Sequence, residues 1–470
     1  MTLPRPLLCT LLLLAGCSES AVPTATGDDD SSSGEPTTGS SSLPPSTTGA
    51  GNESTSSTGL PDTEDGTSGG DGSSSSAGAS VCGDGVVEGT ETCDDGNTED
   101  GDACRFDCRI AFEVLGTSSF HSGTEGVFEV VVDDDGVAWM AGGVRGQGTL
   151  TVAPLVLAYA PDSGFMPAWH PALAEEHTLS AIALHPTGDI LVTGALTVGE
   201  EQDGTLARFD FPDPPLDPGI APVWSLTHDG PDEGSEIANR DYAHDVAVND
   251  EGQVYAAYSS REPDEGTDIR ISKYDADGAE LWSWLYTGAG HDDDFPRKLA
   301  LAPNGDVVFG GLSSEAPGSE GGILGRLSPE GEPLAIETAL PDQVFALDVD
   351  ADGVTAGGIR WIQRRTPTLD DVVFTDTTPG FDVIYGIRAF EGGVAAAGGI
   401  GVVGEQFNVF VAAWTTQGDP IWTDTYGHES GLNDVGRDLA FGPDGTLFVV
   451  GFEEVIGEDD NVFVRRYAFP

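Results

Sequence analysis

The sequence predicts an all-β fold for residues 110–470, and three observations support this prediction. A short apolar strand, a glycine turn and a second apolar strand recur along this stretch. An alternating strand and often a tryptophan-bearing strand follow each such pair, and no long apolar pattern of helical period interrupts them. The chain also contains 65 Gly and 30 Pro among 470 residues, a composition that disfavours a helical protein.

The repeating unit is centred on a turn glycine. In one unit the strand that begins at Asp245 turns at Gly252 and returns from Val254. The turn glycines are Gly136, Gly188, Gly252, Gly305, Gly353, Gly393 and Gly445. Four short strands per unit of about 50 residues are typical of a β-propeller blade. We therefore predict a β-propeller of seven four-stranded blades, preceded by a disordered linker and a small disulfide-rich module.

The two ends of this stretch predict how the ring closes. The last unit stops at its third strand, Val462–Tyr467, whereas Ile110–Leu115 has the pattern of a fourth strand without a blade of its own. Pairing the two would complete the last blade and remove an exposed edge. Closure favours seven blades, although the short unit near Gly353 leaves six or eight open.

The tryptophan strands carry a family resemblance. Leu281–Tyr286 and Ile421–Tyr426 each contain tryptophan at an alternating position, and the matching units cover roughly 241–340 and 383–470. These units resemble the SBBP-type bacterial β-propeller repeat and, more loosely, the quinoprotein-like repeats of assembly-factor lipoproteins. The resemblance implies a fold, and a propeller fold does not define a function.

The N-terminus has the pattern of an export signal. Residues 1–16 contain one positive charge and an apolar run, and they end in Leu14-Ala15-Gly16 before Cys17. This tetrad resembles the lipobox of bacterial lipoproteins, which implies that Cys17 is lipidated. No other apolar stretch reaches the ~20 residues that span a bilayer, so we expect the lipid anchor to be the only membrane attachment. Ser18 after the cysteine favours the outer membrane or cell surface.

Residues 17–80 are expected to form a disordered linker after the lipidated cysteine. Within 18–80 there are 18 Ser, 10 Thr and 11 Gly, with ten acids and no base. Such a segment cannot bury enough apolar surface to offset its chain entropy. The whole chain has a net charge of −61. This charge repels phosphate backbones, so we expect no nucleic-acid partner.

Residues 81–109 form a cysteine-rich module. Four cysteines of an exported chain lie within it, and we expect two disulfides whose connectivity stays open: Cys82, Cys93, Cys104 and Cys108. The spacing has no C-x2-C pair and the segment has no histidine, which disfavours zinc. Residues 82–109 resemble the Myxococcus cysteine-rich repeat. The resemblance implies a surface module of myxobacterial exported proteins, with no known activity.

Acidic loops suggest one cofactor, Ca²⁺. Oxygen ligands gathered in a loop can hold this ion. The candidate ligands are Asp94, Asp95, Asn97, Asp100 and Asp102 in the cysteine-rich module and Asp292, Asp293 and Asp294 in the propeller. The first group lacks EF-hand order, and turn-forming residues between disulfides are the alternative interpretation. Asp348–Gly353 also resembles half a Ca²⁺ loop, but it aligns with the first hairpin of the other repeating units, which favours an Asp-Gly turn.

Strand alternation places the loops between successive blades on one face. The histidines in these loops are His121, His177, His228, His291 and His428, and His121, His228, His291 and His428 are our candidate loop-face residues. They would form a cation site if they converged at the mouth of the central channel, and a set of separate solvated loops otherwise. On the inner strands, Ala183, Ala247, Ala300 and Ala440 share one position with Asp348 and Arg388. We expect those last two charges to compensate each other near the axis.

Catalytic motifs are not evident in the sequence. It contains no Walker loop, G-x-S-x-G elbow or H-E-x-x-H motif, and Gly399–Gly404 precedes a strand pattern where a dinucleotide site needs a helix. We expect a surface-anchored lipoprotein whose propeller is a non-catalytic binding or scaffolding head for an unknown protein or glycan. One alternative is a propeller enzyme, a hydrolase, lyase or quinoprotein-like oxidoreductase, with its site at the channel mouth. Another is an envelope-assembly scaffold.

Overall fold

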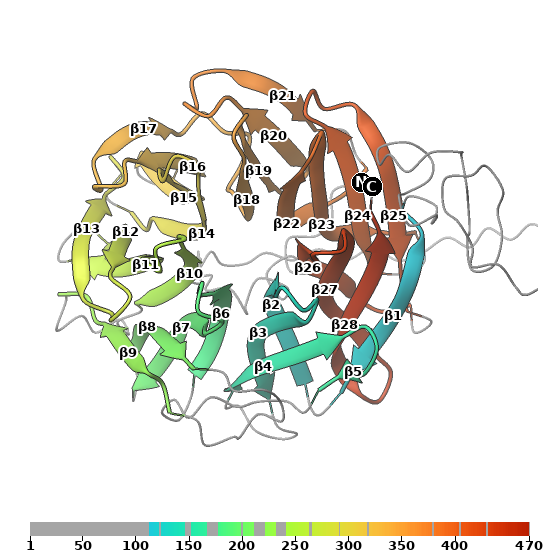
Figure 1. The fold of residues 1–470 in the computed structure, drawn as a ribbon. Helices are drawn as coiled ribbons and strands as arrows, with labels where there is room; N and C mark the ends of the chain where they lie inside the picture. Colours follow the sequence, from blue (N-terminus) through green and yellow to red (C-terminus); the bar gives the residue numbers. More distant parts are fainter. Residues whose placement is uncertain are drawn as a thin grey trace, which may run out of the picture. The chain divides into compact units, whose positions relative to one another are not determined.

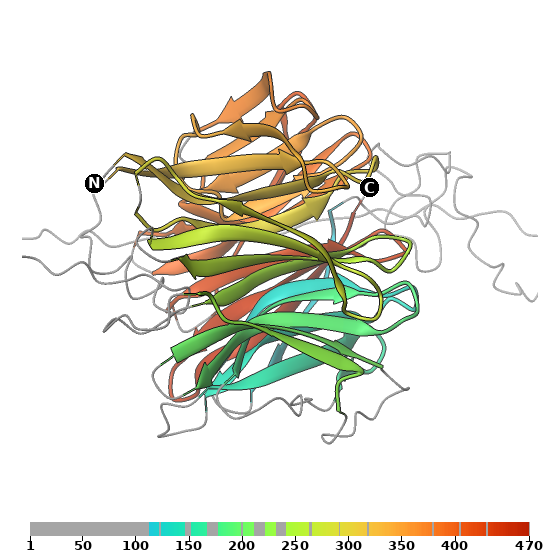
Figure 2. The same ribbon diagram turned by 90° about the vertical axis from the view of Figure 1, so that its left-hand side faces the viewer.

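The computed structural model describes most of residues 112–469, with gaps at 122–123, 146–151, 167–176, 199–200, 211–220, 232–240, 263–265, 291, 317–318, 378–379, 404–405 and 429–430. These residues form seven four-stranded antiparallel sheets. The sheets are arranged as blades around one axis, so the predicted seven-bladed β-propeller is confirmed (Figure 1). Seen from the side, the strands run between the two faces of the ring (Figure 2).

Each blade runs outward from the axis. The innermost strands are β2 (Thr124–Val132), β6 (His177–Leu184), β10 (Tyr242–Val248), β14 (Phe295–Leu301), β18 (Ala346–Val349), β22 (Val383–Phe390) and β26 (Asp434–Phe441). The second strands are β3 (Ala138–Arg145), β7 (Ile190–Val198), β11 (Val254–Glu262), β15 (Val307–Ala316), β19 (Val354–Gly358), β23 (Gly393–Gly401) and β27 (Thr446–Val455).

The outer half of each blade follows in chain order. The third strands are β4 (Val152–Ala160), β8 (Glu201–Phe209), β12 (Gly266–Tyr274), β16 (Ser319–Leu327), β20 (Trp361–Arg365), β24 (Phe407–Thr415) and β28 (Asp459–Ala468). The outermost strands are β5 (Gly164–Phe165), β9 (Trp224–His228), β13 (Glu280–Tyr286), β17 (Pro333–Glu337), β21 (Val372–Asp376), β25 (Pro420–Tyr426) and β1 (Val114–Phe120).

The ring closes through the first strand of the chain. β1 pairs antiparallel with β28, so the last blade takes its outermost strand from the N-terminal side of the propeller. The pairing confirms the predicted closure, but the strand spans Val114–Phe120, whereas we expected Ile110–Leu115. The Phe112 N–H donates to the Ala468 carbonyl at 2.6 Å, which fixes the entry to the strand. Closure leaves no unpaired edge between the first and last blades.

The turn glycines explain the first hairpin of most blades. Gly136, Gly188, Gly252, Gly305 and Gly445 adopt positive φ, which a residue without Cβ reaches at little cost. In the sixth blade the positive-φ residue is Gly392, and the predicted Gly393 begins β23. In the fifth blade Gly353 is not at positive φ; the Asp350 carboxylate accepts the Asp352 and Gly353 N–H groups at 2.8 Å. That contact confirms the predicted turn at Asp348–Gly353.

The tryptophans of the outer strands connect neighbouring blades. Trp224 of β9 donates its indole N–H to the Ala276 carbonyl in the outer turn of the third blade at 3.0 Å. Trp282 of β13 makes the same contact with the Pro329 carbonyl of the fourth blade, also at 3.0 Å. A Cβ on the turn residue Gly278 or Gly331 would overlap these indole rings. The recurring tryptophan therefore marks a repeated contact between blades, and its flat ring requires glycine beneath it.

The core lies between the blades. Seven clusters of buried apolar side chains each join residues of adjacent sheets, as where Val130 of β2 and Val464 of β28 pack in one cluster. These layers hold the inner strands at fixed positions around the axis. Among the described residues, no helix is long and apolar enough to cross a membrane.

Candidate functional site

The inner strands share an irregularity that brings extra side chains toward the axis. A one-residue register shift interrupts the pairing of β2, β6, β10, β14, β22 and β26 with their second strands. Such a bulge places two successive side chains on the same side of a strand. The first residue of each pair we call the bulge position, and the second, which resumes the pairing, we call the network position.

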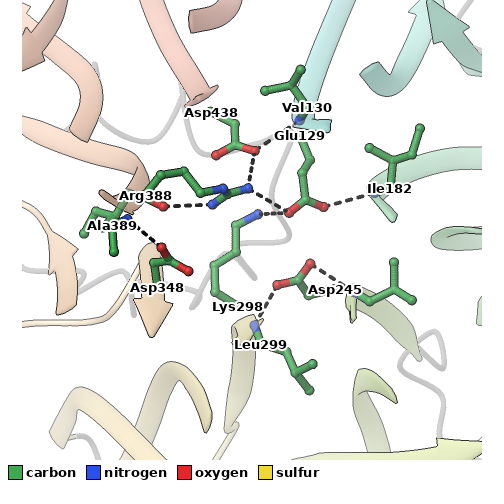
Figure 3. A network of polar contacts seen from close by, with 12 residues as sticks. Glu129, Val130, Ile182, Asp245, Lys298, Leu299, Asp348, Arg388, Ala389 and Asp438 are labelled. Atoms are coloured by element: carbon green, nitrogen blue, oxygen red, sulfur yellow. Dashed lines mark hydrogen bonds and ion pairs between the residues drawn. The ribbon is translucent and has the colours of Figure 1, made fainter. Parts of the chain in front are cut away.

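Charged residues from six blades meet at the axis in what we call the axial network. Its members are Glu129, Asp245, Lys298, Asp348, Arg388 and Asp438, whose side chains point toward one another (Figure 3). Glu129, Asp245, Lys298 and Asp438 occupy network positions, whereas Asp348 and Arg388 lie two residues further along their strands. Four acids and two bases thus lie within the ring.

The carboxylates of the network join one blade to the next. Glu129 accepts the Ile182 N–H at 3.0 Å, and Asp245 accepts the Leu299 N–H at 2.6 Å (Figure 3). The other two contacts follow the same rule: Asp348 accepts the Ala389 N–H at 2.6 Å, and Asp438 accepts the Val130 N–H at 3.1 Å. In every case the donor belongs to the inner strand of the following blade. Four of the seven blade junctions therefore carry a carboxylate contact at the axis.

Two bases balance part of this negative charge. Lys298 Nζ lies 3.0 Å from Glu129 Oε1, and Arg388 Nη2 lies 3.1 Å from Asp438 Oδ2 and 3.9 Å from Glu129 Oε1. Burial, followed by the Asp245 charge, raises the pKa of Glu129 to about 7, against the opposing pull of Lys298 and Arg388. Burial also raises the pKa values of Asp245, Asp348 and Asp438.

The expected partnership between Asp348 and Arg388 takes a different form. Arg388 is near enough to lower the pKa of Asp348 against the effect of burial. Its ion pairs, however, are with Asp438 and Glu129. The sequence analysis aligned the inner strands on the alanine position and did not compare the network position, which lies two residues earlier on the same face of each strand. Aligning the residue two places earlier would have found the other four charges.

The bulge positions form a second set of residues, which we call the bulge ring. The ring consists of Phe128, Ser180, His244, Arg297, Tyr385 and Arg437, together with Phe345, which occupies the equivalent place before Ala346 in the strand without a bulge. These residues precede the network positions along the chain. They consequently lie nearer the face on which the loops between blades enter the inner strands.

Ring contacts run around most of the bulge ring. The Arg437 guanidinium lies over Phe128 and Tyr385, and Tyr385 contacts Phe345 with 5.6 Å between ring centroids. Arg297 continues the series, with its guanidinium carbon 5.8 Å from the Phe345 ring centroid. The Arg297 guanidinium also lies over the Phe295 ring. Phe295 in turn contacts His244 of the preceding blade, with 6.4 Å between ring centroids. Only Ser180 interrupts this sequence of aromatic and cationic side chains among the ring members.

Arg437 has the least usual environment of the ring. The residue is 7% exposed, and its guanidinium carbon lies 4.6 Å from the Tyr385 ring, 5.3 Å from Phe452 and 5.7 Å from Phe128. Cation–π contacts of this kind stabilise a partly desolvated guanidinium. Within the described part of the chain, its Nε has no hydrogen-bond partner and no carboxylate pairs with it. The nearby carboxylate of Asp438, the next residue, pairs with Arg388.

The remaining ionisable member of the ring is uncharged at neutral pH. Burial, followed by the positive charge of Arg297, lowers the pKa of His244 to about 3. Its Nε2 lies 3.1 Å from the Ser259 hydroxyl, which holds the ring in place. The bulge ring therefore presents two guanidinium groups, four aromatic rings including the imidazole, and no acidic side chain. Chemically it can donate hydrogen bonds to an anion and pack against an apolar face.

The predicted loop-face histidines do not supply this site. His228 ends β9, where its Nε2 lies 2.9 Å from the Ser260 hydroxyl and its ring contacts Tyr258. Burial, followed by Arg270, lowers the pKa of His228 to about 4. His121 is exposed after β1, and the His428 N–H donates to Asp434 at 2.7 Å. His177 begins β6, and His291 lies outside the described residues.

The acidic run before β14 is held by protein donors. Asp294 accepts the Gly288 N–H at 2.5 Å and the Ser314 N–H at 2.8 Å. Asp293 accepts the Thr267 N–H at 3.0 Å, and Asp292 accepts the Ser314 hydroxyl at 3.3 Å. Among the described residues, no group of three or more His, Cys, Asp or Glu side chains is arranged to hold a metal ion. The run thus fastens the loop before an inner strand to neighbouring hairpins.

Other predicted site residues lie outside the described residues. They are Cys17, Cys82, Cys93, Cys104, Cys108, Asp94, Asp95, Asn97, Asp100 and Asp102. Lipidation, disulfide formation and Ca²⁺ binding at these positions remain predictions.

Comparisons with known proteins bear on two parts of the chain. Residues 75–109, which contain the four cysteines of the cysteine-rich module, match a family model described as a domain of unknown function, DUF4215. No curated protein matches the chain. Among solved structures, Sqt1 from Chaetomium thermophilum is similar at 12% identity and a TM-score of 0.43, covering 73% of this chain and 83% of that one. A protein of unknown function from Dyadobacter fermentans is similar at 10% identity and a TM-score of 0.47, covering 77% and 100%.

Proposed function

We propose that the protein is a surface-anchored lipoprotein whose β-propeller is a non-catalytic binding head. The observation that carries the binding role is Arg437, a buried guanidinium packed among aromatic rings without a carboxylate partner in the described part of the chain. A buried charge without a counter-ion costs free energy, and binding sites retain such groups where a ligand completes them. The anchor rests on the Leu14–Cys17 tetrad and the export pattern before it.

The axial network supports binding over catalysis. A general acid or base must be able to exchange a proton with a substrate. The four network carboxylates instead accept N–H groups from neighbouring strands, and two of them also pair with Lys298 or Arg388. These contacts occupy the acids nearest the bulge ring, and their role is to join neighbouring blades.

The proposal predicts where the head stands on the cell. We would express the full chain and its Cys17→Ser variant in a bacterial host that processes lipoproteins, and add protease to intact cells. For the natural chain we expect acylated Cys17 by mass spectrometry, a membrane-associated product and loss of the propeller on protease treatment. The Cys17→Ser variant should leave the membrane fraction. A propeller that stays protected until the outer membrane is opened would contradict surface display and favour a periplasmic scaffold.

A further inference from the structure

The bulge ring differs in charge from the rest of the protein. The chain has 80 acidic and 19 basic residues, yet two of the seven ring positions are arginine and none is acidic. The next residues along the same strands reverse this preference, because the network positions hold three acids and one base. A positively charged layer in so acidic a protein indicates a requirement other than solubility.

The shape of the guanidinium limits the kind of ligand. Aromatic rings from three strands, β2, β22 and β27, surround Arg437, and among the described residues its Nε has no hydrogen-bond partner. A guanidinium presents parallel donors that match the two oxygens of a carboxylate. Arg297 adds a second guanidinium on the other side of Tyr385 and Phe345, three blades away around the ring. Both features favour a ligand that bears a carboxylate.

The aromatic members favour a ligand that also has an apolar face. Phe128 and Tyr385 are only half-buried although they lie on inner strands, and the Tyr385 hydroxyl has no hydrogen bond within the described part of the chain. Aromatic faces pack against the C–H face of a flat ring, while hydroxyl groups accept and donate around its rim. The net charge of −61 repels densely charged polyanions from the outer surface. A ligand that carries one carboxylate and several neutral hydroxyl groups on a flat ring meets all of these conditions.

From this combination we infer that the bulge ring binds a sugar acid, a uronic acid residue of a glycan, with its carboxylate on Arg437 and its ring against Phe128 or Tyr385. The inference rests on the proposed binding function and names the ligand class of the same site. Either a free sugar acid or the end of an oligosaccharide could supply this chemistry. Comparing the binding of a single sugar acid with that of a short oligosaccharide distinguishes the two sources.

The test is calorimetric titration of the full chain, purified in detergent, with galacturonic acid, its trimer, the neutral trimer maltotriose and acetate. We expect the galacturonic acid trimer to bind, and maltotriose and acetate to bind at least about tenfold more weakly, because each lacks one half of the recognition. Binding of the monomer as tightly as the trimer would identify a free sugar acid as the source. Stronger binding of the trimer would identify a glycan.

Variants assign the binding to the ring. Arg437→Gln should weaken trimer binding by about tenfold or more, and Arg437→Lys should weaken it as well, since a lysine lacks the paired donors. The matched control is Arg360→Gln, which removes the same charge from a side chain that is 51% exposed and should leave affinity within about twofold. A circular dichroism melt of each variant separates lost binding from lost folding.

Two outcomes would overturn the inference. Either the acidic trimer fails to bind the natural chain, or Arg437→Gln and Arg437→Lys, both folded, bind it as the natural chain does. The proposed binding head survives the first outcome if maltotriose, or another neutral probe, binds in a manner sensitive to Arg437→Gln. It falls with the inference if no probe binds in that manner, whereas protease treatment of intact cells tests its surface display separately.

Discussion

The bulge ring and the axial network are successive layers on the same strands, and they use charge in opposite ways. In the network, Asp438 accepts a backbone N–H of the next blade and pairs with Arg388. One residue earlier, Arg437 has aromatic neighbours and no carboxylate in the described part of the chain. The comparison teaches that a charge such as Asp438, which has partners within the protein, stabilises the ring of blades. A buried charge such as Arg437, which has no charged partner among the described residues, indicates a site for a ligand.

The largest expected effect on stability comes from a substitution that breaks the axial network. Asp438→Ala removes a fully buried carboxylate, which leaves the 25% exposed Arg388 without its nearest partner and the Val130 N–H without its acceptor. Removing one member of a buried pair costs about 3–5 kcal/mol of the free energy of unfolding. Urea denaturation followed by tryptophan fluorescence measures it. Arg360→Gln, which opens the exposed pair with Asp382, should cost less than about 1 kcal/mol. Equal losses for the two variants would remove the structural role that we assign to the network.

The pH dependence of stability tests the same layer. Because the pKa of Glu129 in the folded protein, about 7, exceeds its ordinary value of 4.5, the group's contribution to stability is complete below pH 4.5 and is lost as pH rises through 7. Glu129→Gln should therefore reduce the fall in unfolding free energy between about pH 4.5 and 8 by roughly 3 kcal/mol. Urea midpoints across that range measure the difference. Glu280→Gln, on the exposed side of β13, should keep the natural profile, and an unaltered profile in Glu129→Gln would contradict the pKa.

A smaller effect on stability is expected in the bulge ring. Arg437→Gln removes the cation–π contacts with Phe128, Tyr385 and Phe452, which together are worth about 1–2 kcal/mol. The same denaturation experiment measures the loss. If Arg437→Gln lost as much unfolding free energy as Asp438→Ala, the bulge ring would have a structural role as well. The contrast between the bulge ring and the axial network would then fail.

The smallest effect concerns His244. With its pKa lowered to about 3 by burial and Arg297, the imidazole should stay neutral throughout the physiological range. Nuclear magnetic resonance of the ring carbons should show no titration between about pH 5 and 8, whereas the same histidine in the urea-unfolded chain should titrate near its ordinary value of 6.5. Titration in the folded protein would mean that the ring layer is solvated more like a surface than like a binding site.

Much of the fold could be predicted because its determinants are local. Turn glycines such as Gly252, the alternation of β12 and the tryptophan of β13 each act within a few residues, so they can be found in the sequence without tertiary information. The boundaries of the strands depend on more distant contacts. The closing strand begins at Val114, four residues after the predicted start, because its register is fixed by pairing with β28 at the other end of the chain.

The sequence by itself determined seven repeats, a common position for Asp348 and Arg388 on the inner strands, and a net charge of −61. Only the tertiary structure decided which charges meet. Glu129 and Lys298 are 169 residues apart, and their 3.0 Å contact exists because seven blades close on one axis. The bulges decided the rest, since the extra residue in six of the seven inner strands produces the two layers, and in β26 it places Arg437 and Asp438 side by side in layers of opposite character.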